Sequence, residues 1–182
     1  MAFCCSSGHL FEFCSFERSL NVESDEASRE FDESTEWMLR KDIFVSICEH
    51  FGIKPEIDLF ASRLNAQLDR YVSWHPDPDA EYVDCFTEFW GHDLFYAFTL
   101  FCIVGRAVQK CIHDKAEGIL IIPDWPSQPY YNLVHVISVA EPFEFTVFND
   151  ELLLPFSSNT ERHPLAEGRK GLRLKALHLK AP

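Results

Sequence analysis

Asp58 is the residue of this sequence best placed to do chemistry. It lies near the end of a short apolar run, EIDLF (residues 56–60), and the small residues Ala61 and Ser62 follow it. Small residues let a ligand approach the backbone, and a carboxylate can accept hydrogen bonds from an amine or a hydroxyl group. A helix cap or a buried, hydrogen-bonded carboxylate is the structural alternative. Single acids near strand ends are common, so the pattern alone favours the structural role.

Other polar and aromatic groups give weaker signals. Asp84 and Asp93 follow two further strand candidates, and paired carboxylates can serve acid–base chemistry or metal binding. No spacing forces this pair together, so we interpret both as exposed loop acids and expect no metal site. Trp125, Tyr130 and Tyr131 flank prolines and could form a stacking surface for bases, although a role in covering the core is the stronger alternative. The seven glycines form no phosphate loop or Gly-x-Gly-x-x-Gly motif.

Charge and cysteine content limit the class of protein. The net charge is −13, yet residues 161–182 hold six basic and two acidic side chains. The acidic body repels phosphate backbones, so contact with DNA or RNA is expected only through this basic tail, and a solvated tail without a partner is the alternative. Seven cysteines without framework spacing indicate reduced thiols and an intracellular protein, cytoplasmic or nuclear. No run of 18 apolar residues is present, so no membrane partner is expected, and the oligomeric state stays open.

The elements that would position these residues alternate between helix and strand. Apolar residues recur at helical spacing from Ile43 to Phe51, and Gly52 is a natural stop for that helix. Further strands are predicted at 56–60, 70–74, 82–86, 94–98 and 118–123, and further helices at 101–115 and 130–138. Residues 143–148 and 151–156 are expected to close the sheet as a hairpin. This order predicts an α/β domain with a mostly parallel sheet and helices on both faces.

Ligands of parallel α/β sheets bind beyond the carboxyl ends of the strands. In the predicted order, this rule points to the segments after Phe60, after Phe98 and after Ile122. Composition and periodicity go no further than this α/β domain.

Several phrases of the sequence resemble the polyprotein of DIRS-type retrotransposons, the elements that integrate with a tyrosine recombinase. The phrases are IDLFASRLNAQL, DPDAEYVDCFTEFW, LFYAFTLF and GILIIPDWPSQPYY, and the resemblance covers roughly residues 21–165. In those elements this region follows the ribonuclease H domain. The stretch NVESDEASRE resembles the last motif of that domain, in which Asp25 would be the final metal-binding carboxylate; Asn21, Ser28 and Arg29 match other motif positions. The other carboxylates of a two-metal site are missing, so ribonuclease H activity is not expected.

The next segment resembles the phage-type DNA adenine-N6 methyltransferase domain that these elements carry. The resemblance implies a Rossmann-like methyltransferase fold. It also implies a pocket for S-adenosylmethionine, with Asp58, Ala61, Ser62 and Asn65 on the positions of the family's acidic and small-residue motif.

The family's catalytic loop follows a later strand and reads Asn/Asp-Pro-Pro-Tyr/Phe. Its polar side chain holds the amine of a flipped adenine, its aromatic ring stacks on the base, and its prolines fix the turn. Here the four positions are Phe98, Thr99, Leu100 and Phe101, and only the last keeps its type. The related elements read more like Ala-Phe-Pro-Pro-Phe, so the polar residue is absent there as well. This chain has also lost both prolines.

These observations divide the chain into three parts. Residues 1–36 are expected to be a remnant of the ribonuclease H C-terminal end with an acidic connector, 37–156 a methyltransferase-like α/β domain, and 157–182 a basic tail. We expect a retrotransposon-derived fragment whose methyltransferase-like domain is degenerate and inactive. Two alternatives remain open: an active S-adenosylmethionine-dependent nucleic-acid methyltransferase, and a non-enzymatic module that binds protein or nucleic acid.

Overall fold

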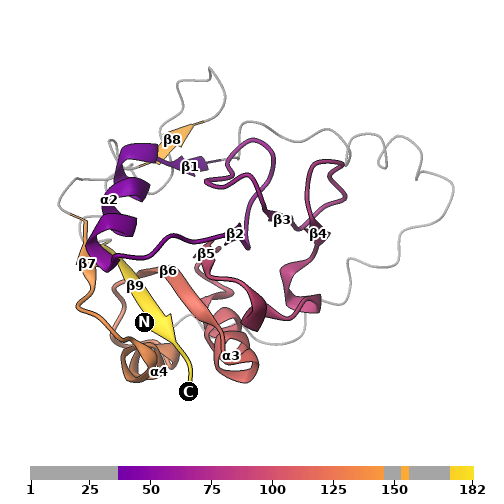
Figure 1. Cartoon of the computed structure of the whole chain (residues 1–182). Helices are drawn as coiled ribbons and strands as arrows, with labels where there is room; N and C mark the ends of the chain where they lie inside the picture. Colours follow the sequence, from indigo (N-terminus) through magenta and orange to yellow (C-terminus); the bar gives the residue numbers. More distant parts are fainter. Residues whose placement is uncertain (1–36, 146–152, 156–172) are drawn as a thin grey trace, which may run out of the picture. The chain divides into compact units, whose positions relative to one another are not determined.

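The computed structural model describes residues 37–145, 153–155 and 173–182, which all belong to one compact unit, Glu33–Pro182 (Figure 1). Asp25 and the other positions of the predicted ribonuclease H motif lie outside the described residues. Among the described helices, none is long and apolar enough to cross a membrane.

A five-stranded sheet forms the centre of this unit, in the order β2-β5-β6-β9-β7. Its strands are β2 (Ile57–Asp58), β5 (Phe95–Phe98), β6 (Glu117–Pro123), β9 (Leu174–Lys180) and β7 (Phe143–Glu144). Strands β2, β5 and β6 run parallel, whereas β9 is antiparallel to both β6 and β7. The predicted α/β class is confirmed. The prediction of a mostly parallel sheet is wrong, because the sheet is mixed.

Strand β9 is the reason for the mixed sheet. It is formed by Leu174–Lys180, which we expected to be part of a basic tail. The strand lies between two neighbours and is covered on both faces, so most of its side chains must be apolar. Glu117 of β6 holds two of its polar side chains: Lys180 Nζ lies 2.7 Å from one carboxylate oxygen, and His178 Nε2 lies 3.1 Å from the other.

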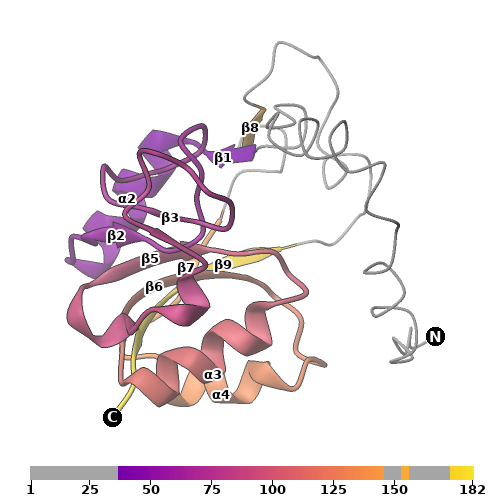
Figure 2. The same ribbon diagram turned by 90° about the vertical axis from the view of Figure 1, so that its right-hand side faces the viewer.

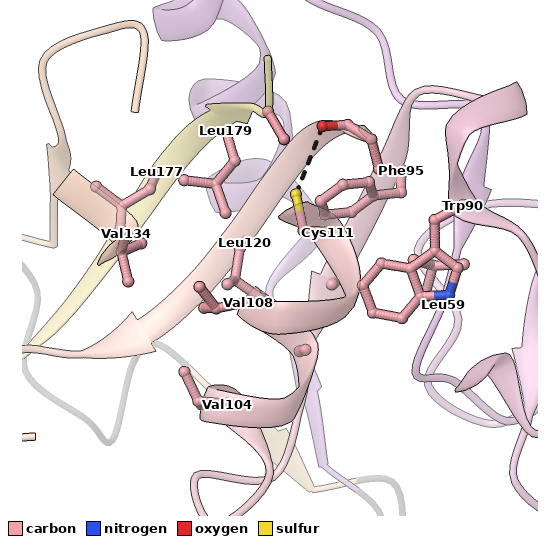
Figure 3. Packing of buried hydrophobic residues seen from close by; sticks show 14 of the residues in the cluster. Leu59, Trp90, Phe95, Val104, Val108, Cys111, Leu120, Val134, Leu177 and Leu179 are labelled. Atoms are coloured by element: carbon pink, nitrogen blue, oxygen red, sulfur yellow. Dashed lines mark hydrogen bonds between the residues drawn. The ribbon is translucent and has the colours of Figure 1, made fainter. Parts of the chain in front are cut away.

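Helices cover both faces of the sheet (Figure 2). Helix α2 (Lys41–Phe51) packs on one face, and helices α3 (Val104–Asp114) and α4 (Tyr130–Ile137) pack on the other. Alternate side chains of β6 point to opposite faces, so Ile119 contributes to the α2 side of the core and Leu120 to the α3–α4 side. In Figure 3, Val108 of α3 and Val134 of α4 lie beside Leu120 and Leu177 of the sheet.

The remaining strands form two small pairs outside the main sheet. Strands β3 (Val72–Ser73) and β4 (Tyr82–Val83) pair in parallel, and β1 (Trp37–Leu39) pairs antiparallel with β8 (Leu153–Pro155). Two short 3₁₀ helices, η2 (Cys85–Thr87) and η3 (Trp90–His92), lead into β5. The predicted hairpin of 143–148 with 151–156 is wrong, because β7 pairs with β9 and β8 pairs with β1.

Candidate functional site

The three segments that the sequence singled out meet at one edge of the sheet. Asp58 ends β2, Phe98 ends β5 and Pro123 ends β6, and these three strands are parallel neighbours. The segments that follow them therefore lie at the carboxyl edge, where α/β sheets bind ligands. The two parts of this edge, after β2 and after β5 and β6, differ in how far they are open to a ligand.

Asp58 is buried, with 2% of its surface exposed. Its Oδ2 accepts a hydrogen bond from the Gln67 backbone N–H at 3.0 Å, and its Oδ1 accepts a long one from the Phe60 N–H at 3.4 Å. Burial raises the pKa of Asp58 to about 7, against the opposing effect of these N–H groups and of Lys41. The side chain thus closes the 58–67 loop from inside, which agrees with the structural reading of its sequence pattern.

Gln67 links this loop to two other elements. No sequence motif predicts this role of Gln67. Its side-chain amide donates to the Leu39 carbonyl oxygen at 2.6 Å, and its backbone carbonyl oxygen accepts a hydrogen bond from Lys41 Nζ. Among the described residues, the buried Gln67 Oε1 and Tyr96 Oη atoms have no hydrogen-bond partner. Tyr96 lies opposite Asp58 in the β2–β5 register, and burial raises the pKa of its hydroxyl well above the usual value.

Ser62 and Asn65 bind each other within the same loop. The Asn65 Oδ1 atom accepts a hydrogen bond from the Ser62 backbone N–H at 2.8 Å, and the Asn65 N–H donates to the Ser62 carbonyl oxygen at 3.2 Å. Ser62 and Ala61 are both buried. These contacts do not fit a pocket for S-adenosylmethionine, because the Asp58 carboxylate and the Asn65 Oδ1 atom accept hydrogen bonds from the loop itself.

Asp77 is a second buried carboxylate, and its role was missed from the sequence. It accepts hydrogen bonds from the Tyr71 hydroxyl at 3.1 Å and from the backbone N–H groups of Arg63 and Asp79 at 3.3 and 3.1 Å. Its position in HPDPDAE, between two prolines, marks a turn in which an aspartate commonly binds nearby backbone. Asp77 therefore holds the 58–67 loop from outside, as Asp58 does from inside.

Asp84 and Asp93 have separate structural partners. Asp84 has a positive φ of 60° and accepts the Phe86 N–H at 3.0 Å, which caps η2. Asp93 binds Arg70 at 2.9 Å, and the same guanidinium group holds Glu81 at 2.7 Å. The ion pair with Arg70 lowers the pKa of Asp93.

The loop after β5 presents little that could hold an amine. Phe98 is half-buried on the α2 side of the core, and Leu100 is 72% exposed. Thr99 is buried, and within the described residues its hydroxyl makes one long hydrogen bond, 3.5 Å, to the Leu100 carbonyl oxygen. The Phe101 ring meets the Trp125 ring edge to face, with centroids 5.5 Å apart.

A groove of about 550 Å³ opens at the carboxyl ends of β5 and β6, beside the first turns of α3 and α4. Its apolar wall consists of Phe101, Trp125, Tyr130 and Leu133, and its polar lining includes the side chains of Gln109 and Gln128. The sequence singles out the first three of these residues. Gln128 belongs to the segment GILIIPDWPSQPYY but has no role assigned there, and Gln109 on its helix carries no pattern.

Tyr131, the third aromatic residue of this segment, does not line the groove. Its hydroxyl donates to Asp124 Oδ1 at 2.5 Å, and Lys175 Nζ of β9 lies 3.3 Å from the same oxygen. This contact fastens the start of α4 to the edge of the sheet.

In the ranges that the structure describes, no group of three or more histidine, cysteine, aspartate or glutamate side chains could hold a metal ion. Comparison with known proteins adds no family: the chain matches no protein-family profile, and no curated protein shows significant similarity to it.

Proposed function

We propose that this chain is a fragment of a DIRS-type retrotransposon polyprotein whose methyltransferase-like domain does not transfer methyl groups. The observation that carries the loss of activity is the environment of Asp58, whose two carboxylate oxygens accept backbone N–H groups of its own loop. The resemblance places a cofactor-binding acid at this position. An acid enclosed by its own loop is not available to a ligand.

The loop after β5 supports the same conclusion from the side of the substrate. Holding an exocyclic amine requires hydrogen-bond acceptors in fixed positions, and two prolines would fix them. Phe98 offers a hydrocarbon ring instead, and Leu100 projects into solvent where the second proline would stand. Losing preorganised acceptors removes the interactions that stabilise developing charge in a transition state.

The test is a pair of measurements on the full chain. Isothermal titration calorimetry with S-adenosylmethionine should give no binding heat at cofactor concentrations of about 1 mM. Transfer of a labelled methyl group to adenine-containing DNA or RNA should not exceed the blank without protein. Methyl transfer above that blank would overturn the proposal. Cofactor binding without transfer would agree with the proposed inactivity. It would contradict the conclusion that the Asp58 loop is closed to a cofactor.

The proposed origin has its own test. Genomic sequence on both sides of the reading frame should encode a reverse transcriptase and a tyrosine recombinase, or recognisable remnants of them. Flanks that carry neither would contradict the retrotransposon origin and leave the question of activity unaffected.

A further inference from the structure

The walls of the groove beside α3 and α4 form a corner of aromatic rings. The Phe101 and Trp125 rings stand at 79° to each other, and the Tyr130 ring lies against Gly105, whose added Cβ would be 3.7 Å from the nearest ring carbon. A flat base stacks best on an open ring face. A corner of perpendicular rings suits a compact aliphatic ring better.

The groove also carries unused hydrogen-bond donors. Within the described part of the chain, the Trp125 indole N–H and the side-chain amides of Gln109 and Gln128 form no hydrogen bond. These groups suit a ligand rich in free carbonyl oxygens. A polyproline II segment is such a ligand, because its backbone makes no internal hydrogen bonds and its carbonyl groups point outward.

The absence of charge in the groove lining favours this ligand over a nucleic acid. Every residue that lines the groove is uncharged, so no lysine or arginine is placed there to meet a phosphate. The described residues together hold 16 acidic and 11 basic side chains, a balance that repels polyanions and attracts cations. The complementary partner is therefore a protein segment whose middle residues are uncharged and whose ends are basic.

We infer that this groove binds a proline-rich protein segment in the polyproline II conformation, flanked by lysine or arginine. Its prolines pack against the Phe101, Trp125 and Tyr130 rings, and the indole and amide groups donate to its carbonyl oxygens. Aromatic grooves that recognise such segments gain affinity because the ligand is already extended and loses little entropy on binding. The inference concerns binding alone and holds whether or not the chain transfers methyl groups.

Fluorescence anisotropy with the full chain tests it. The probe is a fluorescein-labelled peptide of ten prolines with two lysines at each end. The first control peptide replaces the prolines by alternating glycine and serine and keeps the lysines, and the second control probe is a labelled oligothymidylate. We expect saturable binding of the proline peptide below about 1 mM and none of either control.

Matched tryptophan variants locate the site. Trp125→Ala should weaken peptide binding by about tenfold or more, as truncation of a buried aromatic anchor does. Trp74→Ala removes an exposed tryptophan that stacks on His75 away from the groove and should leave affinity unchanged. Gln128→Ala, at an exposed position, keeps the rings and should weaken binding several-fold. Circular dichroism confirms that each variant is folded.

Four outcomes would overturn the inference. They are absence of peptide binding at about 1 mM, equal affinity for the glycine–serine peptide, equal affinity of Trp125→Ala and Trp74→Ala, and binding of the oligothymidylate in place of the peptide. Equal affinity for the glycine–serine peptide would mean that the lysines alone, and not the prolines, cause binding. The last would identify the groove as a single-stranded nucleic-acid site.

Discussion

Asp58 is a carboxylate whose surroundings oppose its charge. The group is buried, and among the described residues two backbone N–H groups and the charge of Lys41 favour the ionised form. Burial prevails, because transfer out of water costs a carboxylate more than two hydrogen bonds return. The protonation state of this single residue therefore contributes to the pH dependence of folding.

The Asp58→Asn variant should remove that contribution. The folded pKa is about 7 and the ordinary value is 3.8, so between these values the folded protein keeps a proton that the unfolded chain releases. The free energy of unfolding of the wild type should thus fall by about 1.4 kcal/mol per pH unit as the pH rises through this window. Urea denaturation at about pH 5 and about pH 7.5 should show a fall of about 2–3 kcal/mol in the wild type relative to the variant.

Asp93→Asn is the control for this measurement. The Arg70 ion pair lowers the pKa of Asp93, so this group is ionised in both states across the same window and adds no slope. The control should keep the pH dependence of the wild type. Parallel curves for the wild type and Asp58→Asn would mean that Asp58 is ionised in the folded protein.

At the residue scale, the sequence predicts a side chain's environment where neighbouring residues in the chain determine it. The sequence singled out Asp58 and favoured a structural role, such as a buried, hydrogen-bonded carboxylate, because an acid at the end of an apolar strand has few possible environments. The sequence does not reveal Gln67 as a partner of Asp58, or Asp77 as a support of the 58–67 loop, since their partners are fixed by tertiary contacts. Such partners become visible only once the strands are placed.

At the scale of elements, strand β6 was predicted correctly and strand β9 was not, because both predictions rest on the hydrophobicity of the segment alone. β6 is a continuous apolar run, GILIIP, so it was identified as a central strand. β9 reads LKALHLK, and its basic residues suggested a solvated tail. Lys175 and Lys180 are tolerated because Asp124 and Glu117 of the neighbouring segment neutralise them, at 3.3 and 2.7 Å. This complementarity depends on the pairing of β6 with β9, which a strand-by-strand reading does not contain.

Gly118 tests the close packing of β5 against β6. It lies opposite Phe95 in the register, where an added Cβ would be 2.2 Å from the Phe95 carbonyl oxygen and 2.6 Å from its Cγ. Gly118→Ala must move backbone, so we expect a loss of about 1–3 kcal/mol or more in the free energy of unfolding. Chemical denaturation followed by circular dichroism measures it.

Gly105→Ala is the matched control. Its added Cβ would meet only Tyr130 Cδ1 at 3.7 Å, an ordinary contact, and alanine is the better helix former in the first turn of α3. The control should be as stable as the wild type or more stable. Equal stability of the Gly118→Ala and Gly105→Ala variants would contradict the β5–β6 packing described here.

At the scale of the whole molecule, the parallel half of the sheet brings segments of different openness to one edge. The loop after β2 is closed by its own hydrogen bonds, whereas the segments after β5 and β6 leave an open aromatic groove. Methyl transfer would require both halves to be open at once, one for the cofactor and one for the base. We therefore attribute the inactivity that we propose to two independent losses rather than one.

Restoring only the loop after β5 should consequently fail to create activity. The triple variant Phe98→Asn, Thr99→Pro, Leu100→Pro gives the family's Asn-Pro-Pro-Phe sequence ahead of α3. Because the Asp58 carboxylate still serves the Phe60 and Gln67 N–H groups, we expect no cofactor binding and no methyl transfer to adenine-containing DNA. The double variant Thr99→Pro, Leu100→Pro, which leaves the half-buried Phe98 in place, controls for damage to the core, and circular dichroism checks both. Methyl transfer by the triple variant would show that the 58–67 loop opens to the cofactor and that the β5 loop alone had silenced the domain.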